Sequence, residues 1–166
     1  MTQSLPEMVM GDTKGRSTMR RSDVRASRTK RETAVALAGV PLFADLPKKH
    51  LRWLAREADE LAFDPGQEIV SEGSLGETLF VVMEGRAKVT RNGRRVGEVL
   101  PGDFFGELST IDGGPRTASI TAVTPVRVVR LFRRTLRKLL EDEPQLSVKI
   151  LDGIVRRIRQ VERRSG

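Results

Sequence analysis

The stretch F-G-E-L-S-T-I-D-G-G-P-R-T-A, residues 105–118, holds a carboxylate and a guanidinium with a turn-rich segment between them. Its glycines and proline let the chain turn back, so we expect the side chains of Glu107 and Arg116 to face one ligand. The guanidinium can hold a phosphate in fork geometry, and the carboxylate can accept a hydrogen bond from a sugar hydroxyl. The stretch therefore predicts a site for a small phosphorylated ribose.

A short helix starting near Glu107 would complete an anion site. The N–H groups of Glu107, Leu108 and Ser109 would point at one spot, and Gly106 would let a ligand approach the backbone. Thr117 can add its hydroxyl and its N–H. A cyclic phosphodiester carries one negative charge, which one arginine matches but a carboxylate repels. We therefore expect Glu107 to bind the ribose 2′-hydroxyl instead.

Short β-prone runs broken by Gly and Pro fill the middle of the chain. Asn92-Gly93 is the strongest hairpin signal, because both residues tolerate the positive φ angles of a type I′ turn. Many short strands at this spacing favour a barrel or jelly roll. Strands are expected at about 61–63, 68–70, 77–83, 87–89, 96–99, 118–123 and 126–132. Helices are expected at about 32–38, 47–58, 133–140 and 143–163.

The last of these helices carries an apolar stripe. Its a/d-type positions follow one another at spacings of 3, 4 and 3, which is typical of a coiled-coil seam about two heptads long. The helix could pack against its own barrel or pair with a second subunit, or do both at different ends. The stripe consists of Leu151, Ile154, Ile158 and Val161, widened by Ile150 and Val155.

The charge of the chain lies at its ends. The net charge is +8, with eight Lys or Arg against four Asp or Glu in residues 1–33, six against two in residues 145–166, and sixteen of each between them. A neutral body is not typical of a nucleic-acid-binding fold, which more often carries a basic face. The basic ends either keep the protein soluble or contact an acidic partner, nucleic acid or membrane lipid.

Composition also bounds the organisation of the chain. Residues 1–32 lack apolar periodicity and are predicted to be a disordered basic tail, followed by one domain over 33–163. The chain has no cysteine, which excludes disulfides and cysteine-based metal sites. The longest apolar run, residues 79–83, is too short to cross a bilayer, and no secretory signal is recognised. We therefore expect a cytoplasmic protein without a membrane span.

No catalytic constellation stands out. The single histidine, His50, lies in a predicted polar helix and is expected at the surface. The common iron site of jelly-roll oxygenases needs two histidines and a carboxylate. The prediction is a protein that is not an enzyme, with no catalytic residues, no metal and no cofactor.

Several segments together resemble the cyclic nucleotide-binding domain family, which includes the catabolite activators, the regulatory subunits of cAMP-dependent protein kinase and cyclic-nucleotide-gated channels. The likeness covers about residues 40–163. Its specific part is the phosphate-binding cassette, in which F-G-E-L-S is followed by a spacer ending in Pro and then R-T-A. The other matching segments are V-P-L-F-A-D-L at 40–46, F-D-P-G-Q-E-I-V at 63–70, E-G-S at 72–74, G-E-T-L-F-V-V-M-E-G at 76–85 and L-P-G-D-F-F-G-E-L at 100–108.

The resemblance implies a fold and a site. The fold would be mainly β, an eight-stranded, jelly-roll-like β-roll over about 59–132 with flanking helices, two of them C-terminal over about 133–163. Glu107 would bind the 2′-hydroxyl. The other ligand-binding residues would be Gly106, Leu108, Ser109, Arg116 and Thr117 around the phosphate, and Val96 and Val99 beside the sugar and base.

The resemblance also implies a function. The protein would be a stand-alone cyclic nucleotide sensor whose C-terminal helix changes its placement when ligand binds. We expect cAMP as the ligand, with cGMP as the alternative because Thr117 could bond a guanine amino group. Partners would be a second copy, through the C-terminal helix, and an unidentified protein. Direct DNA binding is not expected, because no helix-turn-helix follows in the sequence. The rival interpretation is a regulator that contacts proteins or nucleic acid through its basic tails.

Overall fold

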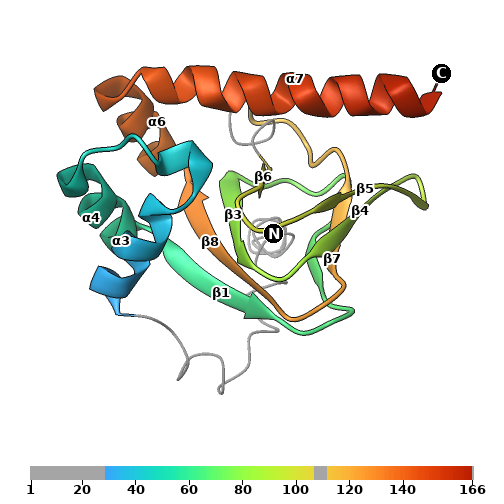
Figure 1. Cartoon of the computed structure of the whole chain (residues 1–166). Helices are drawn as coiled ribbons and strands as arrows, with labels where there is room; N and C mark the ends of the chain where they lie inside the picture. Colours follow the sequence, from blue (N-terminus) through green and yellow to red (C-terminus); the bar gives the residue numbers. More distant parts are fainter. Residues whose placement is uncertain (1–28, 107–111, 166) are drawn as a thin grey trace, which may run out of the picture.

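A computed structural model describes residues 29–106 and 112–165 of the chain (Figure 1). Eight strands form two four-stranded antiparallel sheets, which confirms the β-roll and the fold class. One sheet has the order β1-β8-β3-β6 and the other β2-β7-β4-β5. The strands are β1 Asp59–Phe63, β2 Glu68–Val70, β3 Thr78–Glu84, β4 Ala87–Arg91, β5 Arg94–Val99, β6 Phe104–Phe105, β7 Ser119–Ala122 and β8 Val126–Phe132.

Two features of the strands bear on the predictions. The type I′ signal is confirmed, since Asn92 and Gly93 have φ angles of 53° and 79° between β4 and β5. Strand β6 was not predicted, because two residues are too few to show an alternating pattern. It pairs with β3 at Phe80 and Val81. The pairing matters for function, because β6 leads directly into the cassette.

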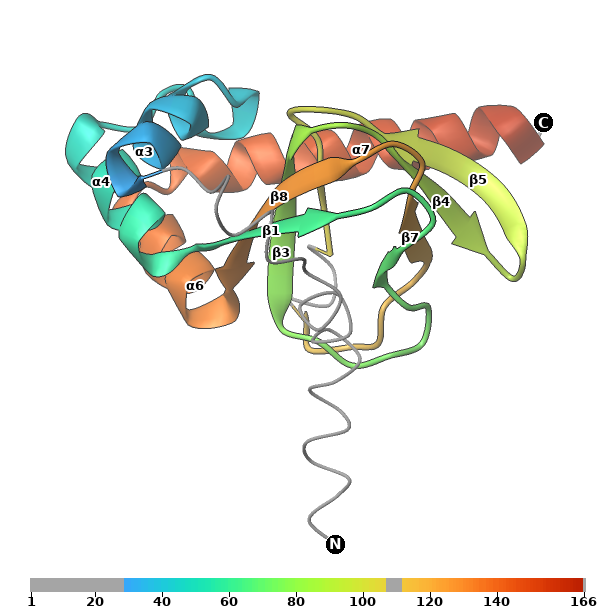
Figure 2. The same cartoon turned by 90° about the horizontal axis from the view of Figure 1, so that it is seen from below.

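Helices flank the roll on one end and along one side. Helix α3 begins slightly earlier than expected, because Thr29 and Glu32 form a reciprocal capping box at its start. Figures 1 and 2 show α3, α4 and α6 gathered at one end of the roll, while α7 runs along its whole length. The helices are α3 Lys30–Ala38, the 3₁₀ turn η1 Pro41–Phe43, α4 Lys48–Glu57, α6 Arg133–Asp142 and α7 Gln145–Ser165.

Strand alternation divides the interior into two apolar cores. On β3, Leu79 and Val81 face the helices, whereas Phe80 and Val82 face the inside of the roll. Strand β8 alternates in the same way. The central strands are therefore buried on both faces, which explains why residues 79–83 form a continuous apolar run.

Helix α7 is apolar on two faces. One face is buried against the body through Leu146, Ile150 and Gly153. The other remains open, and its large apolar side chains are 41–59% exposed: Val148, Leu151, Val155 and Ile158. The residues of the predicted stripe therefore lie on two faces of the helix and not at its two ends: Ile150 faces the body, whereas Leu151 faces outward. Val161, also assigned to the stripe, has a side chain outside the described part of the structure.

Candidate functional site

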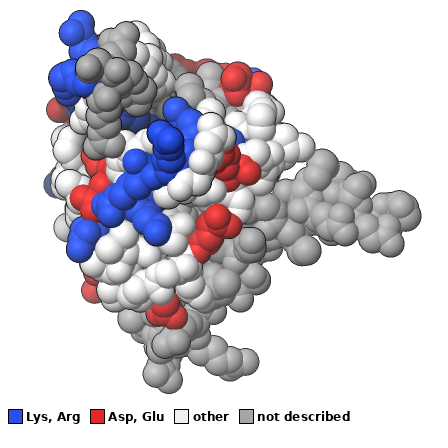
Figure 3. Space-filling model, turned by 90° about the vertical axis from the view of Figure 1, so that its right-hand side faces the viewer, with Lys and Arg blue, Asp and Glu red and all other residues white. Residues whose placement is uncertain are grey.

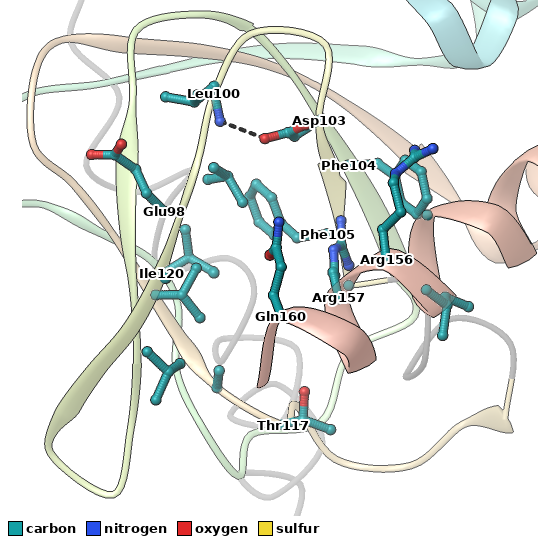
Figure 4. Close-up of a pocket in the computed structure, with 18 of the residues that line it drawn as sticks. Glu98, Leu100, Asp103, Phe104, Phe105, Thr117, Ile120, Arg156, Arg157 and Gln160 are labelled. Atoms are coloured by element: carbon teal, nitrogen blue, oxygen red, sulfur yellow. Dashed lines mark hydrogen bonds between the residues drawn. The ribbon is translucent and has the colours of Figure 1, made fainter. Parts of the chain in front are cut away.

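A pocket of about 950 Å³ lies between the β-roll and α7 (Figure 4). Strands β4 and β5 form one wall, β6 and residues 116–118 form the inner end, and residues 149–160 of α7 lie across the opening. Figure 4 shows Arg156, Arg157 and Gln160 on the α7 side, facing Glu98 and Leu100 across the space. The size and the mixture of apolar walls with a few polar groups are typical of a small-molecule site.

Arg116 lies at the inner end of this pocket and is only 3% exposed. Its Nη1 donates to the carbonyl oxygens of Thr78 at 2.9 Å and Gly106 at 3.2 Å, and its Nη2 donates to Thr78 Oγ1 at 3.0 Å. The guanidinium also lies 5.7 Å from the centre of the Phe80 ring. Oriented neutral acceptors hold this buried cation in a fixed place, a suitable arrangement for meeting an anion.

The backbone around Arg116 is equally constrained. Its N–H donates to the Ser74 carbonyl and its own carbonyl accepts from the Gly73 N–H, both at 2.8 Å. These two bonds attach the end of the cassette to the loop between β2 and β3. The loop contains the E-G-S segment at 72–74, so this part of the resemblance has a structural function: it anchors the arginine.

Gly106 has to be a glycine for two reasons. Its φ is +85°, and a Cβ there would lie 2.6 Å from Arg116 Nη1 and 2.8 Å from the Thr78 carbonyl oxygen. Contacts that short do not occur, so a side chain would displace the arginine. The glycine therefore permits the close packing that positions the guanidinium.

The other predicted residues divide into two groups. Val96, Val99 and Thr117 line the pocket, and the Thr117 carbonyl accepts a hydrogen bond from Arg91 Nε at 3.0 Å. Glu107, Leu108 and Ser109, and the helix expected to start there, lie outside the described residues, so their assignments stay predictions.

Sequence reasoning did not single out the residues of α7 that line the pocket. Arg157 lies 4.8 Å over the Phe104 ring, and Gly153 approaches the same ring so closely that a Cβ would be 2.5 Å from its Cζ atom. Lys149 donates to the Pro41 carbonyl at 2.8 Å and pairs with Asp45 at 2.9 Å. A glycine in the middle of an amphipathic helix was a usable signal of close packing.

His50 is not part of the pocket. It is partly buried rather than on the surface, because its ring lies 3.0 Å from a Glu143 carboxylate oxygen at the junction of α6 and α7. Within residues 29–106 and 112–165 no three His, Cys, Asp or Glu side chains gather as metal ligands would. None of the described helices is both long and apolar enough to span a bilayer.

The comparison with known families identifies this fold. Residues 60–143 match the model of the cyclic nucleotide-binding domain. The chain belongs to the cyclic nucleotide-binding domain family. The match includes nearly all of the strands and extends through α6, so it covers the roll and the cassette.

Individual relatives of this domain are regulatory proteins. The chain is 33% identical over 129 residues to a CRP-like cAMP-activated global transcriptional regulator of Mycobacterium tuberculosis, covering 75% of this chain and 58% of the regulator. The chain thus spans little more than half of that relative. The regulatory domain of Toxoplasma gondii PKA, solved with cAMP, superposes with a TM-score of 0.67 at 26% identity, over 74% of this chain and 49% of that one. The Thermus thermophilus catabolite activator protein superposes with a TM-score of 0.65 at 28% identity, over 74% of this chain and 60% of that one.

Proposed function

We propose that this domain senses a cyclic nucleotide, with cAMP favoured, and is not an enzyme. The observation that supports this most is the buried Arg116 guanidinium at the inner end of the pocket, which packs closely against Gly106. A cyclic phosphodiester would place its single negative charge there. Its ribose would reach the cassette carboxylate, Glu107, and its base would lie against Val96 and Val99 beneath α7.

A buried guanidinium supports an anionic ligand in this proposal. Thr78 and Gly106 offer Arg116 neutral acceptors, and a phosphate oxygen would make stronger, charge-assisted bonds to the same guanidinium. The favoured nucleotide is proposed from the relatives, which include a regulator named as cAMP-activated and a regulatory domain solved with cAMP. Thr117, which lines the pocket, keeps cGMP as the alternative ligand.

The proposal is tested by calorimetric titration of the full chain with cAMP, cGMP and 5′-AMP. Replacing Arg116 by Ala should weaken cAMP binding at least tenfold, about 1.4 kcal/mol or more, because the variant lacks charged hydrogen bonds of about 1.5–3 kcal/mol. The matched control is Arg134→Ala, an exposed arginine of α6 away from the pocket. Arg116→Lys keeps the positive charge at the buried site, and it replaces the alanine variant in the test if that variant does not fold. Unchanged affinity in a folded variant would refute the assignment.

Signalling would proceed through α7. Arg156, Arg157 and Gln160 line the pocket, so a bound nucleotide would contact the helix and favour one of its placements over another. A nearly complete switch requires roughly 10⁴-fold higher affinity for the favoured placement. Hydrogen exchange of the α7 amides with and without cAMP measures the shift, and identical exchange in both states would argue against this part of the proposal.

The exposed stripe of α7 supports a second element of the proposal, a homodimer. Four large apolar side chains at spacings of 3, 4 and 3 would be covered by the α7 helix of another copy. Light scattering should give twice the mass of one chain for the parent protein and the mass of one chain for Leu151→Glu. A monomeric parent at micromolar concentration would contradict the dimer while leaving nucleotide binding intact. The protein that receives the signal is not specified by these observations.

A further inference from the structure

The β4–β5 hairpin carries five of the eight basic residues of the roll, residues 59–132. Five of the ten residues from 86 to 95 are basic, and no acidic residue stands among them. Figure 3 shows a band of Lys and Arg on this side of the molecule. The even charge count of residues 34–144 therefore conceals a strongly basic segment. This basic hairpin consists of Arg86, Lys88, Arg91, Arg94 and Arg95.

Nearby carboxylates neutralise the basic hairpin only in part. Arg86 and Arg95 share one carboxylate, that of Glu98, at 3.0 Å each. Among the described residues, Lys88 and Arg94 form no ion pair. One more acidic side chain reaches the turn, since Glu72 Oε1 accepts a hydrogen bond from the Asn92 N–H at 3.0 Å. The basic hairpin therefore has five cationic side chains and only two neighbouring carboxylates, those of Glu98 and Glu72.

The pairing of the strands places like charges together. Arg91 and Arg94 are direct cross-strand partners, an arrangement that destabilises a hairpin unless an anion lies between or beside the two groups. Arg95 is paired with Thr90, on the opposite face of the ribbon from the Arg91–Arg94 pair. The tip of the hairpin thus carries cations on both of its faces.

Cations on both faces fit a groove with two negative walls. We propose that the basic hairpin docks in the major groove of double-stranded DNA. Its two strands lie about 4.8 Å apart, and the major groove of B-DNA, about 12 Å wide, admits a two-stranded ribbon between its rows of phosphates. Figures 1 and 2 both place the C-terminal half of α7 beside the hairpin, where the exposed Arg156, Arg159 and Arg163 add positive charge.

A membrane surface is less well matched by the same observations. A flat anionic surface would contact one face of the ribbon and leave the cations of the other face unpartnered. Peripheral membrane segments also insert apolar side chains beside their cations. None of the exposed large apolar residues of the described chain lies on the hairpin itself, between residues 86 and 99.

The test is binding of the full chain to a mixed-sequence DNA duplex of about 20 base pairs, two helical turns, followed by fluorescence anisotropy as salt is varied. The variant Lys88→Ala/Arg94→Ala/Arg95→Ala leaves the pocket lining unchanged. The matched control is Arg52→Ala/Arg134→Ala/Arg137→Ala, which removes three exposed arginines from α4 and α6 at the other end of the molecule. Both variants keep residues 1–28, so any contribution of that segment cancels.

The parent and the control should bind the duplex with the same salt dependence. In the hairpin variant, the slope of log K against log salt should become shallower by about 0.9 for each phosphate that the variant no longer neutralises, roughly two to three in all. An unchanged slope, or a parent that binds anionic lipid vesicles but not the duplex, overturns the proposal. The same variant should bind cAMP with the affinity of the parent in calorimetric titration, because the replaced residues do not line the pocket. The DNA result is thus independent of the result for the nucleotide site.

Discussion

Gly153 is a point of very close approach between α7 and the roll, and a single methyl group tests its importance. A Cβ at this position would lie 2.5 Å from Phe104 Cζ and 2.9 Å from its Cε2. Carbon atoms pack best at about 3.5–4.0 Å, so the helix and the ring would have to separate by about 1 Å. Phe104 is itself buried, and it belongs to the core shared with the helices.

The expected effect of Gly153→Ala is a balance of opposing contributions. Overpacking a core costs about 1–3 kcal/mol. Displacing the ring also weakens its contact with Arg157, a cation–π pair of about 0.5–1 kcal/mol. Alanine in a helix gains about 1 kcal/mol over glycine. The free energy of unfolding should therefore fall by roughly 0.5–3 kcal/mol, or the melting temperature by about 2–10 °C.

The control is a double-mutant cycle with Phe104→Leu, read by urea unfolding. Leucine lacks the two ring atoms that a Cβ would meet, so in that background Gly153→Ala should be neutral or stabilising by up to about 1 kcal/mol. The sign of the effect should thus reverse. If Gly153→Ala instead raised the free energy of unfolding of the parent by about 1 kcal/mol, the full gain of alanine over glycine in a helix, α7 would not approach Phe104 as closely as described.

Two further predictions concern the roll and its helical end. Gly85→Ala should destabilise the protein by more than about 4 kcal/mol or abolish folding, because its Cβ would lie 2.0 Å from the Pro125 carbonyl oxygen. Gly93 has open space around it, so Gly93→Ala should cost only about 1–2 kcal/mol, the strain of a left-handed backbone at a non-glycine residue. Equal losses of stability for the two variants in urea unfolding would contradict this reasoning. Thr33→Val should cost about 1–3 kcal/mol, since the buried hydroxyl donates to Glu60 Oε2 at 2.9 Å; a melting temperature at or above that of the parent would refute it.

Local signals in the sequence were sufficient for most elements of the fold. Asn92-Gly93 predicted its hairpin because two positive φ angles are rare outside such turns, and the alternating or continuous apolar runs predicted seven strands. The eighth, β6, is too short for any period to show. The helix starting near residue 30 was expected slightly later, since the side chain that caps it, Thr29, stands within a polar segment.

For the site, the sequence by itself determined the residue types, and the tertiary structure determined their surroundings. Arg116, Thr117, Val96 and Val99 were predicted from motif and resemblance, because the chemistry of a guanidinium or an apolar wall belongs to the side chain. What holds Arg116 came only from the fold: Thr78 lies far from it in the sequence and meets it across the roll.

The feature that no local pattern contained is which residues of α7 lie over the pocket. A periodic stripe shows that a helix has an apolar face, but not which of several apolar surfaces will cover it. That placement depends on contacts between α7 and strands far from it in the sequence, such as the approach of Gly153 to Phe104. The basic run at 86–95, by contrast, is visible in the sequence itself.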